Sequence, residues 1–387
     1  MTWELDPTNV GTDLPLEGVR VLDLSRVLAG PLCAMIAGDL GADVIKVESP
    51  DGDPIRALAP PRFGSDATYF LVVNRHRRNV VADLHNPRDF ARVVALVKLA
   101  DAVVENYLPS QVRSLGIDRL REENPECVWV SITPATQGGP LADQPSFDLL
   151  AQARSGLMGV TGDIEAPSKV GAPVADVVTG LYGAIALVSG LLGKARGREG
   201  RHFEAPLLES TMSALVNQAQ CFLSTGVNPQ RLGNDHPSIT PYGPVTTADG
   251  FLLLAVGTDA QYSKLVGALA DPTLTRRKEW ATNDARVTAR EELALELHRI
   301  FSQHDTTYWL HTLEHSGVPH APILDVEGAF AQDQIAQGTF VGTMSTPSGE
   351  TRAMRTPLRI DGQRPLIRRG PRAKGQDTEE IFGSDAD

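Results

Sequence analysis

The stretch from residue 16 to residue 50, "LEGVRVLDLSRVLAGPLCAMIAGDLGADVIKVESP", decides the fold. Residues Val19–Leu24 form a β-branched and apolar run, which is typical of a buried strand. The turn "AGP" interrupts that run, and Pro31 suits the first turn of a helix, where its missing N–H costs nothing. Gly41 ends the helix, and "DVIKVE", residues 43–48, is a second strand. A strand–helix–strand unit of this length predicts two parallel strands.

The same alternation of strands and helices continues along the first half of the chain. Three further apolar runs have the length of strands, and a helical stretch separates the first two. We predict strands at Val80–Leu84, Ala102–Glu105 and Val128–Ile132, and a helix at Pro87–Leu99. Strands that alternate with helices in this way predict an α/β domain with a parallel sheet.

The composition of the chain changes near residue 228. Before this point, Phe203–Gly226 predicts a long helix. After it, a loop rich in Pro, Gly and Asn leads to "VTTADGFLLLAVG", residues 245–257, where a DG turn between apolar runs predicts a hairpin. A chain of 387 residues also exceeds what one compact core usually holds. We therefore expect a large domain at 1–227, a smaller α+β domain at 228–325, and a return segment at 326–387 that packs on the large domain.

Composition narrows the classes of function. The formal net charge is -12, which argues against a general nucleic-acid binder, because the surface of such a protein is basic. The three cysteines, Cys33, Cys127 and Cys221, are far apart and odd in number, so they predict neither a metal site nor a disulfide framework. The N-terminal segment lacks the basic and apolar regions of a signal peptide. We expect a cytoplasmic protein that binds no metal.

A helix without charged residues begins directly after Asp176, at residues 177–193. The run is at the short limit for a bilayer span and is diluted by glycines, so we predict a buried helix with close neighbours.

An aspartate before a helix, such as Asp176, is most often an N-cap. It is also a candidate nucleophile, because it is ionised at neutral pH and the free N–H groups of the helix stabilise an oxyanion beside it. Attack on an acyl group gives a mixed anhydride, which is useful when the leaving group returns, as a thiolate does.

Two clusters of basic residues stand out in this acidic chain. The run "NRHRRNVVADL" contains Arg75, His76, Arg77 and Arg78, and the tail contains Arg364, Arg368, Arg369, Arg372 and Lys374. Charge runs of this kind are typical of solvated segments, and the first run is also a candidate for phosphate capture by guanidinium groups.

The turn after the first predicted strand, "SRVLAGP", lacks the glycines of the GxGxxG motif that binds dinucleotides. Binding of NAD or FAD is therefore not expected.

Taken together, the motifs closely resemble the class III CoA-transferase family, which includes formyl-CoA, carnitine and dicarboxylate CoA-transferases and α-methylacyl-CoA racemases. The resemblance covers nearly the whole chain. It rests on residues 16–56 and on "NRHRRNVVADL", "DAVVENYLPSQVRSLGI", "GGPLADQPSFDLLAQARSGLMGVTG", "VGAPVADVVTGLYGAIALVSGLLGKARGREGRHFE", "RLGNDHPSITPYGPVTTADG" and "GVPHAPILDV". It implies a Rossmann-like large domain that binds coenzyme A, and an interlocked homodimer whose small domains close over the partner's site.

The resemblance also implies roles for single residues. Asp176 falls on the aspartate that becomes an aspartyl-CoA thioester. The residues that it implies at the CoA are Val27, Leu28, Ala29, Arg77, Asn106, Tyr107 and Arg113. Those that it implies at the acyl substrate are Phe147, Asp148, Gln152, His236, Tyr242 and Asp259. An arginine common in the family falls on Ser114, so we expect the adjacent Arg113 to replace it.

Two departures from the family pattern narrow the activity. Racemases carry a histidine where Phe147 stands, and racemisation needs two titratable groups, one on each face of the substrate. Formyl-CoA transferases carry a glutamine where Leu28 stands, and a glycine-rich lid where this chain reads "VGTDAQY", so an oxalate site is not expected.

We therefore predict a CoA-transferase that moves CoA from an acyl-CoA, its co-substrate, to a small carboxylic acid. No nucleic-acid, membrane or metal partner is expected. Two alternatives stay open. One is an α-methylacyl-CoA racemase or epimerase that uses Asp176 together with Asp148 or Asp259. The other is a non-catalytic CoA-binding protein with the same fold.

Overall fold

The computed structural model describes residues 2–383 and divides into two compact units. The large unit comprises Met1–Leu157, Lys169–Val227 and Gln334–Asp387, and the small unit comprises Met158–Ser168 and Asn228–Asp333. The expected domains, 1–227, 228–325 and 326–387, stay a prediction. Each unit is described by itself below.

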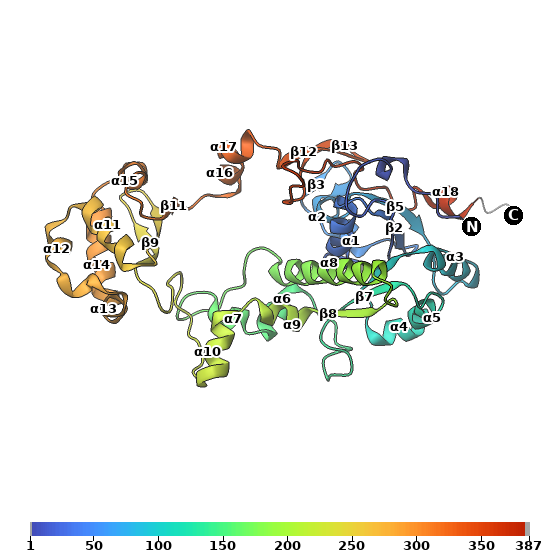
Figure 1. Ribbon diagram of the computed structural model, residues 1–387, viewed down its shortest axis with the longest axis horizontal. Coiled ribbons are helices and arrows are strands. Elements are labelled where there is room, and N and C mark those ends of the chain that lie inside the picture. Colours follow the sequence, from blue (N-terminus) through green and yellow to red (C-terminus); the bar gives the residue numbers. More distant parts are fainter. Residues whose placement is uncertain (1, 384–387) are drawn as a thin grey trace. The chain divides into compact units, whose positions relative to one another are not determined.

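A six-stranded parallel sheet forms the centre of the large unit (Figure 1). Its strands are β1 (Arg20–Asp23), β2 (Asp43–Glu48), β5 (Arg77–Val81), β6 (Ala102–Glu105), β7 (Val128–Thr133) and β8 (His202–Pro206). They lie in the order β5-β2-β1-β6-β7-β8, and every neighbouring pair is parallel. The strand order reverses between β1 and β6, and ligands of such sheets bind outside the carboxyl ends of the strands at that reversal. The predicted α/β fold with a parallel sheet is confirmed.

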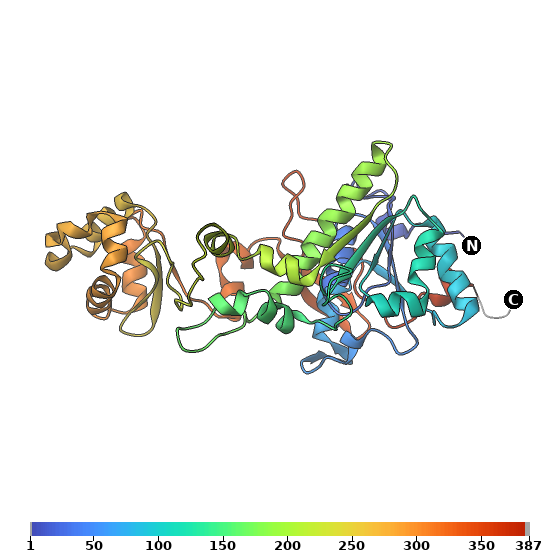
Figure 2. The same ribbon diagram turned by 90° about the horizontal axis from the view of Figure 1, so that it is seen from below.

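Apolar side chains from successive residues of the strands build a core on each face of the sheet. Val21 and Val44 pack with α1 (Ala29–Asp39) and α8 (Val174–Ala195). Leu22 and Ile45, one residue further along each strand, pack on the other face with α3 (Pro87–Leu99) and α5 (Ile117–Glu122). Figure 2 shows the helices on the two sides of the strands. A parallel sheet covered on both faces explains why its strands read as continuous apolar runs.

The glycines of α8 allow the close packing that the sequence predicted. A Cβ on Gly180 would lie 2.8 Å from the carbonyl oxygen of Ala29, and one on Gly183 would lie 3.0 Å from Ile132 Cδ1. Among residues 2–383, Val174–Ala195 is the one helix that is long and apolar enough to cross a membrane. Its glycine face packs against α1 and the sheet, so we interpret it as a core helix of the large unit.

Two sequence predictions near the sheet are wrong. The segment Phe203–Gly226 is not one helix: it begins in β8 and continues as α9 (Leu207–Ser213) and α10 (Asn217–Thr225). The left-handed backbone of Val216, with a φ of 42°, separates those two helices. The strand expected at Val80–Leu84 begins earlier, at Arg77. Its two arginine side chains can be buried because they form ion pairs with buried carboxylates.

Short elements complete the large unit. The helices are α2 (Thr68–Val73), α4 (Pro109–Leu115), α6 (Asp148–Arg154) and α18 (Thr378–Phe382), with 3-10 turns at Pro7–Asn9 and Pro54–Ala57. The strand pairs are β3 (Arg62–Phe63) with β4 (Asp66–Ala67), and β12 (Val341–Thr346) with β13 (Gly349–Met354). Two helices, α7 (Leu157–Val160) and α17 (Asp333–Ala336), include residues of both units.

The C-terminal segment is fastened to the large unit by its basic residues. Arg369 pairs with the buried Asp6 at 2.6 Å, and Arg368 donates to the carbonyl of Gly38. Arg372 pairs with the buried Asp377 at 2.7 Å. The interpretation of this tail as a solvated basic segment is therefore wrong for Arg368, Arg369 and Arg372, whereas Lys374 is exposed as expected.

The small unit is an α+β structure in its own right. Its sheet has the antiparallel order β11-β10-β9, made of β9 (Tyr242–Thr246), β10 (Phe251–Ala255) and β11 (His320–Pro322). The predicted hairpin is confirmed as β9 and β10. The helices are α11 (Asp259–Leu269), α12 (Pro272–Arg276), α13 (Asn283–Thr288), α14 (Arg290–Phe301), α15 (Thr306–Leu313) and α16 (Val326–Ala331), with a 3-10 turn at Lys278–Ala281. Leu252, Trp280 and Phe301 lie in one buried cluster.

Candidate active site

The turn between β1 and α1 has an unusual backbone. Val27 has a φ of 68°, a left-handed conformation that β-branched residues rarely adopt. Asp53 Oδ1 accepts the N–H of Val27 at 3.1 Å. Asn106, directly after β6, accepts the N–H of Arg26 at 2.9 Å and donates to its carbonyl oxygen at 2.8 Å. The two bonds of Asn106 join the turn to the strand on the other side of the reversal, so Val27, Leu28 and the start of α1 are held in place.

Arg77 does not reach the ligand side of this turn. Its side chain is 2% exposed and its Nη1 lies 3.0 Å from Asp23 Oδ2 and 2.6 Å from Asn74 Oδ1. Lys46 joins the same buried cluster, 3.0 Å from Asp53 Oδ2. The structure therefore argues against the expected contact between Arg77 and CoA. Arg77 instead stabilises the buried base of the turn through its ion pair with Asp23.

The neighbours of Arg77 are engaged in the same way. Arg75 makes a bidentate pair with Asp39, at 2.7 and 2.6 Å, and Arg78 lies 2.7 Å from Asp43 Oδ2. All of these side chains are buried. Arg75 and Arg78 are therefore neither part of a solvated turn nor open to a phosphate group. Both sequence-based interpretations of the run are wrong for these two arginines.

Arg26 is a cation outside the set of residues predicted from the sequence. Its guanidinium carbon lies 4.6 Å from the centre of the Tyr107 ring, and its Nη2 donates to Gln111 Oε1 at 3.4 Å. Tyr107 in turn donates its backbone N–H to the buried Glu105 at 2.8 Å. Arg26 thus lies at the strand reversal where an anionic ligand of this fold binds, half-buried and without a described carboxylate partner.

Arg113 lies on α4 and lines a cavity of about 140 Å³. Its side chain is 66% exposed and is 3.8 Å from Asp143. The hydroxyl of Ser114 donates to the carbonyl of Gln111 at 3.2 Å. Arg113 is therefore exposed and held only by a long ion pair with Asp143, whereas Ser114 is engaged within its own helix.

Asp176 is the third residue of α8, not its N-cap. The helix begins at Val174 and the cap position is Pro173, whose side chain offers no acceptor. Burial, and after it the negative charge of Asp148, raise the pKa of Asp176 from 3.8 to about 7. Among residues 2–383, no hydrogen bond to its carboxylate is found. A carboxylate so placed is available as a nucleophile, and a strongly raised pKa is typical of functional sites.

Asp148 and Gln152, both on α6, support the start of α8. Asp148 Oδ1 accepts the N–H of Ala175 at 2.8 Å, so this carboxylate serves as the missing cap. Its Oδ2 accepts from Gln152 Nε2 at 2.7 Å. Gln152 Oε1 accepts the N–H of Val170 at 2.8 Å. Both side chains are thus engaged with the protein rather than presented to a substrate.

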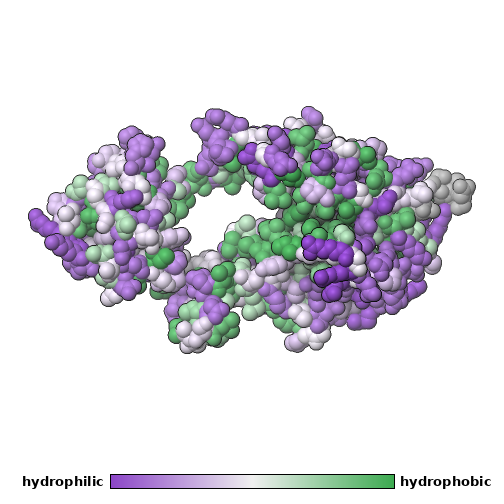
Figure 3. All heavy atoms as spheres, in the orientation of Figure 1, coloured by the Kyte–Doolittle hydropathy of each residue, from purple (hydrophilic) through white to green (hydrophobic). Residues whose placement is uncertain are grey.

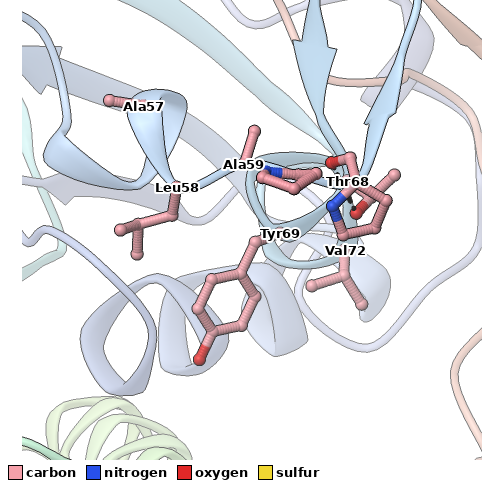
Figure 4. A pocket seen from close by; sticks show the side chains of 8 residues that line it. Ala57, Leu58, Ala59, Thr68, Tyr69 and Val72 are labelled. Carbon is pink, nitrogen blue, oxygen red and sulfur yellow. Dashed lines mark hydrogen bonds between the residues drawn. The ribbon is translucent and has the colours of Figure 1, made fainter.

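Tyr69 is a second residue outside the predicted set. Burial, and after it the charges of Asp176 and Asp148, raise the pKa of its phenol. Tyr69 also packs in the cluster that contains Leu28 and Val177. It lines a cavity of about 610 Å³ together with Ala57, Leu58, Ala59, Pro60, Pro61, Thr68 and Val72 (Figure 4). The walls of this cavity are mostly apolar, and Tyr69 is the lining residue whose pKa the charge of Asp176 raises.

The remaining predicted residues divide between the units. Phe147 precedes Asp148 in the large unit and is 62% exposed. His236 and Tyr242 lie in the small unit with ring centres 5.2 Å apart. Asp259 Oδ1 accepts from the fully buried Arg286 at 2.9 Å, which gives this carboxylate a structural partner and weakens its case as an acid or base.

A family model described as CoA-transferase family III matches residues 16–378. The chain belongs to this family. It is 40% identical over 376 residues to the succinate–glutarate CoA-transferase of Agrobacterium fabrum, covering 93% of this chain and 92% of that protein. It is 36% identical over 338 residues to the human succinyl-CoA:glutarate CoA-transferase, covering 86% and 77%. A CaiB/BaiF family protein from Brucella suis has a TM-score of 0.85 and 34% identity, covering 95% and 98%.

Family membership and these relatives establish the class of activity. The chain is a CoA-transferase that moves CoA from an acyl-CoA to a free carboxylic acid. The prediction from sequence is confirmed at this level, and neither the racemase nor the non-catalytic alternative is needed. No group of three or more metal-ligating side chains is found within the described residues.

Simple signals in the sequence could have pointed to the two missed residues. Arg26 stands in the "SRVLAGP" turn itself, beside residues that were singled out. Tyr69 lies in the apolar run "TYFLVV", residues 68–73, where its hydroxyl is the least expected group. A buried tyrosine needs a polar partner or a ligand for that hydroxyl.

Proposed function

We propose that this CoA-transferase works through Asp176 as its covalent nucleophile. The observation that carries the proposal is the half-buried carboxylate in the first turn of α8, which no described residue hydrogen-bonds and whose pKa is raised to about 7. A carboxylate that its surroundings solvate poorly is a better nucleophile than one held by several donors. It is also still ionised in a large fraction at neutral pH.

The proposed steps balance as follows. An Asp176 carboxylate oxygen attacks the carbonyl carbon of the donor acyl-CoA, the C–S bond breaks, and the electron pair leaves as CoA thiolate. The thiolate attacks the aspartyl carbonyl of the mixed anhydride, which forms aspartyl-CoA and releases the donor acid as a carboxylate. The acceptor carboxylate then repeats both steps in reverse. No net proton transfer is needed, which suits a site whose nucleophile is a carboxylate.

The N–H groups of the first turn are less available to an oxyanion than the sequence suggests. Ala175 donates to Asp148, and Val177 donates to the carbonyl of Pro173 at 3.0 Å. The positive end of the α8 dipole still favours negative charge at this position. The Tyr69 hydroxyl, whose pKa is raised by burial and by the charge of Asp176, is a further candidate donor to the developing oxyanion.

We place the CoA at the carboxyl ends of β1 and β6. Val27, Leu28 and Ala29 would form the wall beside the thiol, and Asn106 holds that turn in shape. Arg26 and Arg113 would bind anionic groups of the nucleotide, with Tyr107 holding the Arg26 guanidinium in place. The apolar cavity beside Tyr69 would take the acyl group.

The proposed substrates are small dicarboxylic acids and their CoA thioesters. Support comes from the relatives named above, which are described as acting on succinate and glutarate at 36–40% identity. His236 and Tyr242 of the small unit are proposed to take part in recognising the acid. A panel that pairs succinyl-CoA, glutaryl-CoA and acetyl-CoA with free mono- and dicarboxylic acids tests this assignment.

The proposed assembly is a cytoplasmic homodimer, in which a second copy covers the outer face of α8. Four apolar side chains form a stripe on that face at helical spacing: Leu181, Ile185, Val188 and Leu192, which are 48%, 61%, 37% and 50% exposed. Figure 3 shows hydrophobic side chains gathered over this helix. An exposed apolar stripe of this length is unusual on a monomer. Light scattering on purified protein tests the assembly, and a monomer at micromolar concentration would contradict it.

The decisive variant for the mechanism is Asp176→Ala. We expect transfer to fall at least about a thousandfold, as is usual when a covalent nucleophile is removed, while CoA binding by calorimetry stays within a few fold of the wild type. An Asp176→Ala variant with near wild-type turnover would contradict the proposal.

A further inference from the structure

A buried glutamine connects α6 to the loop that leads into α8. Gln152 is completely buried, and its amide bonds in two directions: to Asp148 Oδ2 at 2.7 Å and from the N–H of Val170 at 2.8 Å. Asp148 then accepts the N–H of Ala175 at 2.8 Å. The bonds therefore hold both ends of the segment from Val170 to Ala175, which comes directly before Asp176.

We propose that Asp148 and Gln152 are positioning residues for CoA transfer, which fix the loop 170–175 and the first turn of α8 so that the Asp176 carboxylate keeps one orientation toward the acyl cavity. This inference rests on the proposed role of Asp176. It replaces the expectation that Asp148 and Gln152 contact the substrate.

The loop has few other means of fixing itself. The segment "VGAPVA" offers only small or apolar side chains, and Pro173 occupies the cap position without an acceptor. The hydroxyl or carboxylate that normally caps a helix is here supplied by α6. Removing that acceptor would leave a partly buried N–H unpaired at the turn that carries the nucleophile. A displacement of about 1 Å of a reacting group is enough to lower a catalytic rate about a hundredfold.

The direction of each hydrogen bond makes the pair specific. The Gln152 amide must donate to position 148 and accept from Val170, which a glutamate cannot do when position 148 is also a carboxylate. Position 148 must accept from both Ala175 and Gln152, which a single amide oxygen does poorly. Reversing the donor and the acceptor at both positions at once restores the chain of bonds, because an amide at position 148 would then donate to a carboxylate at position 152.

The experiment is a double-mutant cycle with Gln152→Glu, Asp148→Asn and the double variant. We expect each single change to lower kcat about tenfold or more, with the KM for acyl-CoA within about twofold of the wild type. The double variant should recover most of the loss. Gln144→Glu, on an exposed residue that accepts a bond from Arg154 of α6, is the matched control and should leave kcat unchanged. Single variants with wild-type kcat, or a double variant whose loss is the product of the two single losses, would overturn the proposal.

A pH profile tests whether the Asp148 carboxylate lies close enough to Asp176 to act on it. The titratable groups that interact electrostatically with Asp176 are Asp148 from α6 and Tyr69 from α2. Asp148→Asn removes a negative charge beside Asp176, so the midpoint of the acid limb of kcat should move to lower pH. The same charge is lost if Asp148 is merely structural, so the midpoint tests only the closeness of the two carboxylates. Recovery of kcat in the double variant is the readout that separates positioning from loss of stability. If Asp176→Ala still transfers CoA, the proposed function fails first. If Asp176 forms its adduct while the cycle and the midpoint stay unchanged, only the positioning role fails.

Discussion

At the scale of the residue, the ionisation of Asp176 makes the free energy of unfolding depend on pH. Its folded-state pKa of about 7 lies above the ordinary value of 3.8, so the folded protein binds a proton that the unfolded chain releases. Stability from this group is therefore present at low pH and is lost as pH rises through 7. Asp176→Asn should raise the free energy of unfolding at pH 8 by on the order of 2 kcal/mol, and the gain should vanish toward pH 4. Urea unfolding at both pH values checks this, and equal stability of the two proteins at pH 8 would contradict it.

At the scale of the element, α8 depends on a close approach to α1. A Cβ on Gly180 would meet the carbonyl oxygen of Ala29 and Leu32 Cδ2, at 2.8 and 2.9 Å. Gly180→Ala should therefore lower stability by about 1–3 kcal/mol and move the first turn of α8, which lowers kcat as well. Gly193→Ala is the control on the same helix. Nothing lies within 4 Å of its Cβ, so it should gain up to about 1 kcal/mol from helix propensity. Thermal unfolding of the two variants checks the sign of each change, and a stable, active Gly180→Ala variant would argue against tight packing.

At the scale of the whole molecule, the C-terminal segment returns to the sheet of the large unit. Asp377 is 1% exposed, accepts the N–H of Asn79 on the edge strand β5 at 2.7 Å, and pairs with Arg372. Asp377→Ala should cost about 3 kcal/mol, because it leaves a guanidinium and a strand N–H without their partner. Glu380, which is 65% exposed and lies 3.5 Å from Arg78, is the comparison: Glu380→Ala should change stability by less than about 0.5 kcal/mol. Similar melting temperatures for the two variants would mean that the segment adds little to the fold.

Much of the fold was predictable because it follows from apolar periodicity. The strands at Ala102–Glu105 and Val128–Thr133 are buried on both faces, so their sequences leave little choice. The edge strand β8 was missed because a short strand with one neighbour carries a weak pattern, and its register is decided by β7. Arg77 was misjudged because its partner, Asp23, is far away in the sequence. Only the parallel packing of β1, β2 and β5 brings the two charges together.

The candidate site was predictable in its centre but not in its surroundings. Asp176 follows from a carboxylate at the start of an uncharged helix, together with the family resemblance. The roles of Asp148 and Gln152 depend on hydrogen-bond directions across α6 and α8, which no spacing reveals. The effect of Asp176 on the pKa of Tyr69 depends likewise on tertiary packing, which places Tyr69 of α2 and Val177 of α8 at the same apolar cluster.

The central claim is that CoA becomes covalently attached to Asp176. The measurement that tests it most directly is intact-protein mass spectrometry after incubation with succinyl-CoA, with and without hydroxylamine, followed by peptide mapping. We expect an adduct with the mass of CoA less water, which hydroxylamine removes, which maps to the peptide containing Asp176 and which is absent from Asp176→Ala. An unmodified protein that still turns over succinyl-CoA, or an adduct on another residue, would contradict the account.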